Sequence, residues 1–189
     1  MCFQNSGASI SGESGSVIVA SGTAFWANSG SLQLATGYSR NGRGGSIYVS
    51  VGSGTSGTGG ELVLSAGTSS ATASGGRMTL VSGYSTLTSS GSLLIQTANS
   101  GTGGASGLMV LSTGTSSSGN TGSLFIGTGT ASSGRGGSIY MTAGSGDSGS
   151  GGQMLFTAGI SSSSTGGQVS IISGYSAVSS SGSMLLKVR

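Results

Sequence analysis

Short apolar stretches recur along the chain at a nearly constant interval, and a glycine precedes each of them. These anchor glycines are 15 residues apart in nine intervals and 16 residues apart in two. They are Gly15, Gly30, Gly45, Gly60, Gly76, Gly91, Gly107, Gly122, Gly137, Gly152, Gly167 and Gly182. A position is written below as its distance from the preceding anchor, so Leu124 is a +2 residue. A fixed period of this kind predicts a repeat architecture, in which each repeat forms one structural unit.

Each repeat contains one stretch with the pattern of a strand. Apolar residues occupy +2 to +4, as in Leu124-Phe125-Ile126, and a second glycine occurs at +7 in ten of the eleven complete repeats, Ala98 being the exception. Glycine at this frequency disfavours a helix, because each one costs about 1 kcal/mol in a helix interior. The sequence therefore predicts a short strand, a glycine corner, a second short strand and a turn in every repeat.

Repeats that cannot bury their apolar side alone must stack on one another. We therefore expect an all-β fold, a single β-solenoid (β-helix) of about twelve 15-residue coils with a thin core and no helices. Residues 42–48 return unchanged as residues 134–140, so the array 1–189 is expected to be continuous and to consist of two six-coil blocks, 1–90 and 91–189. Because neither end carries a recognisable cap, we expect this array to be part of a longer array or a filament.

The alternation of side chains along a strand assigns the faces. We expect +2 and +4 to point inward, the +7 glycines to adopt corner conformations forbidden to other residues, and the small +9 residues to lie on the return strand opposite the core. The inward pairs are Val17/Val19, Leu32/Leu34, Ile47/Val49, Leu62/Leu64, Met78/Leu80, Leu93/Ile95, Met109/Leu111 and Leu124/Ile126.

The outward +3 positions are also mostly apolar. Such a stripe exceeds the apolar area that a soluble monomer normally exposes, and it predicts packing against another solenoid or another chain. Ordinary strand preference on a half-exposed surface is the alternative. This lateral-assembly stripe consists of Ile18, Tyr48, Val63, Leu94, Val110, Phe125, Tyr140, Leu155 and Leu185.

Composition adds one alternative to the fold. The chain has 41 Gly, 46 Ser and 19 Thr among 189 residues, which is also typical of a flexible linker. The apolar residues nevertheless keep their phase over a dozen repeats, and this regularity favours the solenoid.

The scarcity of reactive side chains argues against an enzyme. There is no His, and the acids are only Glu13, Glu61 and Asp147, so neither a Ser-His-Asp triad nor a His-rich metal site can form. The Gly-x-Gly-x-x-Gly match at residues 52–57 lacks the helix and acid of a dinucleotide site. We expect no cofactor, no metal, no nucleic acid and no membrane span. Cys2 is expected to be a buried apolar group at an inward position.

The pattern in residues 122–129, Gly-Ser-Leu-Phe-Ile-Gly-Thr-Gly, resembles the Gly/Ser/Thr-rich tandem-repeat β-solenoids of microbial and algal fibre-forming or adhesin-like surface proteins. The resemblance implies an extracellular or cell-surface structural role. We therefore expect a non-catalytic protein that self-assembles into a filament or appendage by axial stacking and lateral packing. The alternatives are an adhesin stalk, an ice-binding solenoid, or contact of the arginines with acidic polysaccharide.

Overall fold

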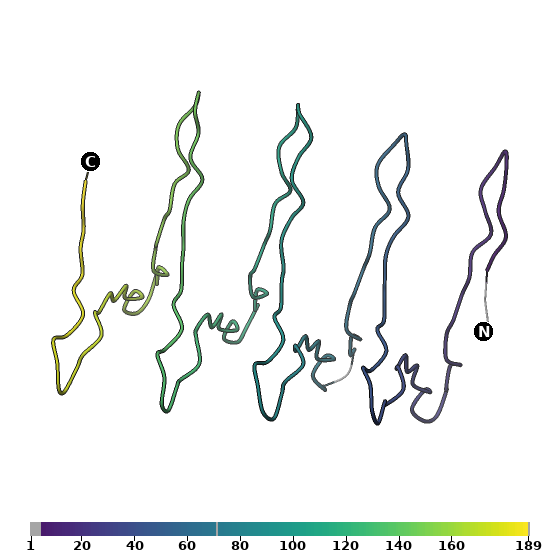
Figure 1. Ribbon diagram of the computed structural model, residues 1–189, viewed down its shortest axis with the longest axis horizontal. Coiled ribbons are helices and arrows are strands. Elements are labelled where there is room, and N and C mark those ends of the chain that lie inside the picture. Colours follow the sequence, from purple (N-terminus) through teal and green to yellow (C-terminus); the bar gives the residue numbers. More distant parts are fainter. Residues whose placement is uncertain (1–4, 71, 189) are drawn as a thin grey trace. The chain divides into compact units, whose positions relative to one another are not determined.

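The computed structural model describes residues 5–70 and 72–188 of the chain. These residues contain neither a helix nor a strand, and the trace in Figure 1 accordingly has no coiled ribbon and no arrow. The chain divides into two units, Met1–Leu94 and Ile95–Arg189. Both units are built from the same local features, and these follow the 15-residue period of the sequence.

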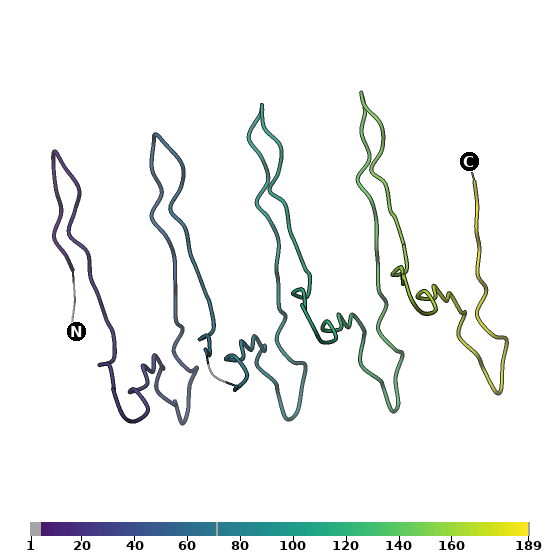
Figure 2. The same ribbon diagram turned by 180° about the vertical axis from the view of Figure 1, so that it is seen from behind.

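The first of these features is a sharp bend near +11 of the repeat. Within each unit the trace runs out to such a bend and returns, as the opposite views in Figures 1 and 2 show. The bends lie at residues 10–12, 25–27, 40–42, 55–57, 70 with 72–73, 86–88, 102–104, 117–119, 132–134, 147–149, 162–164 and 177–179. We call the residues from the +7 position to the next anchor the loop, and the six residues after an anchor the extended segment.

A pair of glycines closes the base of many loops, and we call this pair the neck. The N–H of the anchor Gly152 donates to the carbonyl of the +7 glycine Gly144 over 2.8 Å. The same bond joins four more pairs at 2.8 to 2.9 Å: Gly76 to Gly67, Gly91 to Gly83, Gly167 to Gly159 and Gly182 to Gly174. In two other loops the hydroxyl of the +6 threonine donates to the anchor carbonyl, from Thr36 to Gly45 and from Thr128 to Gly137.

In the loops that have a neck, the neck explains why the anchor is glycine. A Cβ built on Gly152 lies 3.2 Å from the backbone nitrogen of Gly144, and one built on Gly167 lies 3.1 Å from that of Gly159. These distances are tighter than ordinary van der Waals contact, and the obstacle is backbone that cannot turn aside. An anchor side chain would therefore push the two sides of the neck apart.

The loop also absorbs the irregular spacing of the anchors. The neck glycines Gly67 and Gly76, in a 16-residue repeat, are nine positions apart, whereas Gly83 and Gly91, in a 15-residue repeat, are eight apart. The additional residue consequently lies in the loop, and the extended segments keep the same length.

Serine at +9 holds the bend. The Ser116 hydroxyl oxygen accepts from the N–H of Gly119 at 2.9 Å, and Ser161 accepts from Ser164 at 3.0 Å. Ser9, Ser85 and Ser176 make the equivalent bond to the residue three positions on. Serine side chains stabilise turns through such local bonds to the backbone, so the recurring +9 serine forms part of the turn.

This architecture contradicts the predicted all-β solenoid. None of the described residues belongs to a strand, and none of them is buried, so the +2 and +4 residues do not form a core. A strand needs a neighbouring strand to complete its hydrogen bonds. The backbone-to-backbone bonds instead close five loops on their own necks, and the segments between the loops have no such partner among the described residues. The repeat period predicts which residues recur, but it does not predict which segment, if any, pairs with them through backbone hydrogen bonds.

Two further expectations were wrong for local reasons. Among the described residues only Gly7 and Gly57 have positive φ, so glycines such as Gly129 and Gly144 at +7 do not occupy a conformation reserved for glycine. The +9 serines do not lie on a return strand, because their hydroxyls hold the bend. Cys2, predicted to be buried, lies outside the described residues.

Candidate assembly surface

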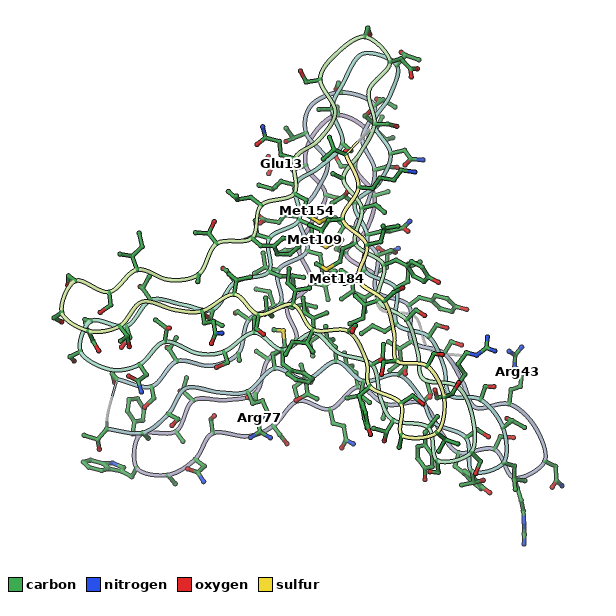
Figure 3. All side chains as sticks on the ribbon, turned by 90° about the vertical axis from the view of Figure 1, so that its left-hand side faces the viewer. Glu13, Arg43, Arg77, Met109, Met154 and Met184 are labelled. Atoms are coloured by element: carbon green, nitrogen blue, oxygen red, sulfur yellow. The ribbon has the colours of Figure 1, made fainter. Side chains whose placement is uncertain are left out.

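The extended segments keep the alternation of an extended chain although they form no sheet. The twelve +2 residues from Val17 to Met184 are all 44 to 59% exposed, whereas the nine residues of the lateral-assembly stripe are 68 to 92% exposed. In Figure 3, Met109, Met154 and Met184 mark the +2 position in the second unit. Alternate residues of an extended chain point to opposite sides, and the +2 side is the more sheltered one.

The side chains at +3 and +5 lie on the other side. A Cβ built on Gly127, at +5, would come within 2.9 Å of the Phe125 ring, at +3. The Phe125 side chain therefore folds along the chain over Gly127 and still remains almost fully exposed. All nine predicted stripe residues are exposed, and their role in assembly stays a prediction.

The backbone of the extended segments is unpartnered. Six backbone-to-backbone hydrogen bonds join described residues, and none of them involves a residue at +1 to +6. Folded globular proteins contain about one hydrogen bond per residue, mostly between backbone groups. Unpaired N–H and C=O groups in an extended apolar chain are a template for pairing with another chain.

The total accessible surface, polar and apolar together, shows how little of the chain is covered. It amounts to 19199 Å² for a chain of 17.8 kDa, whereas a folded monomer of this mass exposes about 8,000 Å² and its unfolded chain about 26,000 Å². The excess over a folded monomer is about 11,000 Å². A standard protein–protein interface buries about 1,600 Å² in total, so this surface exceeds what one such interface covers.

The half-buried residues lie beside the necks and at the bends. Five described residues are half-buried: Ser39, Ala66, Ser82, Ala158 and Ser176. Three of these occupy +6, beside a neck, and two are +9 serines. The little shelter that the single chain provides is thus concentrated at the necks and bends, next to the most polar part of the repeat.

No pocket is present in the described part of the chain, and no three His, Cys, Asp or Glu side chains come together there to hold a metal ion. No helix among the described residues is long and apolar enough to cross a membrane. Arg43, which follows the bend at residues 40–42, extends away from the ribbon in Figure 3, and its predicted contact with polysaccharide stays a prediction.

The neck and the serine-held bend are not part of the predicted solenoid. Both had a signal in the pattern, because the two glycines and the +9 serine recur in phase with the apolar stretch. A serine that begins a run of small polar residues is typical of a turn. The predicted solenoid places this serine on a return strand, because a solenoid requires a second sheet.

Comparisons with known proteins leave the family open. No protein-family model, no curated protein and no solved structure matches this chain. The resemblance to surface proteins with Gly/Ser/Thr-rich repeats therefore remains an expectation from the sequence alone.

Proposed function

We propose that this protein is a structural, non-catalytic protein that assembles with copies of itself into an extracellular filament or surface appendage. The observation that carries the proposal is the exposure of every apolar extended segment in the described chain. Burial of apolar surface contributes about 25 cal/mol per Å², so the exposed segments provide a large driving force for association. Within the single chain this apolar surface stays exposed, because none of the described apolar side chains is buried.

A partner must match the exposed surface along its whole length. The segments recur at 15 or 16 residues, and another copy carries the same segments at the same spacing. Charge presents little obstacle, because the chain has six basic and three acidic residues and a net charge of +3. A surface with so little charge offers weak repulsion between identical chains.

The extracellular or cell-surface location is part of the same proposal. The proposal of this location rests on the resemblance in repeat style. Fractionation of the cells that make the protein, with detection by an antibody, tests it directly.

The first experiment measures assembly of the purified chain. We expect sedimentation velocity to show species far larger than 17.8 kDa, and negative-stain micrographs to show filaments. A monodisperse monomer at all soluble concentrations contradicts the proposal.

A pair of matched variants tests whether the segments drive assembly. Phe125→Asp with Tyr140→Asp places two carboxylates in the lateral-assembly stripe. Phe25→Asp with Tyr175→Asp makes the same two changes in loops, at side chains of nearly equal exposure: 92 and 86%, against 92 and 88% in the stripe. We expect the stripe variant to assemble only at a concentration about tenfold higher or more, because burying an unpaired charge is costly. Equal effects of the two variants would remove the segments as the cause.

A further inference from the structure

We infer that the extended segments complete their backbone hydrogen bonds with segments of neighbouring copies, and that the +7 glycines are where those copies approach most closely. This inference rests on the proposed self-assembly and specifies the contact by which it occurs. The partner is a second copy of this chain, and the contact is a hydrogen-bonded ladder between chains.

The backbone of the segments is the first reason. The N–H and C=O groups at +1 to +6 form no backbone-to-backbone bond within the described chain. Successive segments are separated by a loop, and the bonds at the necks join residues of that same loop, for example Gly167 to Gly159. Each segment is therefore open along both edges, and the apolar residues at +2 to +4 favour an extended backbone.

The +7 glycines are the second and independent reason. A Cβ built on any of the ten +7 glycines, from Gly22 to Gly174, meets no heavy atom within 4 Å. None of these glycines has positive φ. Within a single chain, neither space nor conformation requires glycine at +7, although it occurs there in ten of eleven repeats.

The anchor glycine differs from the +7 glycine in the space available for a side chain. It faces the same neck, and a Cβ on Gly152 or Gly167 meets backbone of the +7 residue at 3.1 to 3.2 Å. Contacts within the single chain thus explain why the anchor of the neck is glycine, but they do not explain why the +7 residue is glycine. A glycine allows another backbone to approach closely, and the backbone that remains to be placed is that of a neighbouring copy.

The amount of exposed surface indicates more than one neighbour. The excess of about 11,000 Å² over a folded monomer is several times the area of a standard interface. Segments that are open along both edges can pair with one copy on each side. Because the additional residues of the 16-residue repeats lie in loops, the segments of two copies keep equal lengths along the array.

Alanine substitution at +7 tests the close approach. Gly114→Ala, Gly129→Ala and Gly144→Ala add methyl groups where the single chain has open space. The matched control is Gly103→Ala, Gly134→Ala and Gly149→Ala, at loop bends where the nearest atom is 3.9 Å away or further. Both sets change three glycines of the second unit, none with positive φ. We expect the +7 variant to need a concentration about tenfold higher or more to assemble, by overpacking against the neighbour, and the control to assemble like the unmodified chain.

Isotope dilution tests the hydrogen bonds themselves. Uniformly ¹³C-labelled chain is assembled alone and then in an excess of unlabelled chain, and the amide I band is recorded by infrared spectroscopy. Vibrational coupling between labelled neighbours is lost on dilution if the hydrogen-bonded neighbours belong to other chains. A ¹³C band that dilution does not change means pairing within one chain and overturns the inference.

The outcomes separate this inference from the proposed function. If the unmodified chain stays monomeric, the proposed function fails and the inference fails with it. If the unmodified chain assembles and the stripe variant weakens assembly, but the +7 alanine variant assembles as readily as its control, self-assembly stands and the close approach at +7 is wrong.

Discussion

The loops and the extended segments of this chain differ in which backbone hydrogen bonds they form within a single chain. In a loop, some backbone N–H groups form hydrogen bonds at the neck or with the +9 serine. Examples are the N–H of Gly152 with the carbonyl of Gly144 and the N–H of Ser164 with the hydroxyl of Ser161. A segment such as residues 123–128 is the most apolar part of its repeat, yet none of its backbone groups has a backbone partner. The usual arrangement of apolar inside and polar outside is therefore absent, and the polar part of the repeat carries the local order.

The difference follows from the range of the interactions. A serine hydroxyl reaches an N–H three residues away, and a neck closes over eight or nine residues, so both depend only on nearby sequence. A strand ladder and an apolar core require a second segment, and its source is not fixed by local sequence. The loop contacts form within one chain, whereas the segments have no backbone partner among the described residues.

The largest effect is expected from removing apolar side chains of the segments. Leu124→Ser, Ile139→Ser and Met154→Ser remove three +2 residues, each worth about 1.5 to 3 kcal/mol when buried. Assembly should shift to a concentration at least about a hundredfold higher, measured by sedimentation. Leu87→Ser, Ile160→Ser and Val178→Ser make similar changes in loops, where the side chains are 92 to 98% exposed. If the loop set weakens assembly equally, the contrast between the two regions is lost.

An intermediate effect is expected at the neck, where the two glycines should respond differently. Gly152→Ala places a Cβ 3.2 Å from the Gly144 backbone nitrogen and should break the neck bond, at a cost of about 1 kcal/mol. Gly144→Ala meets open space and should leave that bond intact. Hydrogen exchange of the residue 152 amide, measured in unassembled chain, reports whether the neck bond is present in each of the two variants. Equal protection in the two variants would show that the neck does not depend on the close approach.

The smallest effect is expected at the bend. Ser116→Ala and Ser161→Ala remove one hydroxyl acceptor each, and this should cost about 0.5 to 1 kcal/mol of local stability. Exchange of the Gly119 and Ser164 amides should accelerate, while the assembly concentration stays unchanged. Ser117→Ala and Ser162→Ala, next to the capping serines, serve as controls. A change in assembly comparable with that of the segment variants would mean that the bend is also part of the contact between copies.

Much of the local structure could be predicted from the sequence, and the tertiary structure could not. The 15-residue period predicted one turn in every repeat, and every repeat bends once, near +11. The glycine-only conformation predicted at +7 was wrong. Strand alternation predicted that +2 residues such as Met109 would be more sheltered than +3 residues such as Phe125, and they are, although none is buried. The predicted core was wrong, because periodicity is equally compatible with neighbours from the same chain and with neighbours from another.

The sequence by itself determined the repeat, its length, the side of the backbone on which each apolar residue lies and the scarcity of reactive groups. Only the tertiary structure decided that the anchor glycine serves the neck, that the +9 serine holds the bend, and that the segments have no backbone partner within the described chain. The physical reason is that turns and alternation arise from interactions over a few residues. Burial and strand pairing depend on which second segment lies beside the first, and in a repetitive sequence many segments are equivalent as pairing partners.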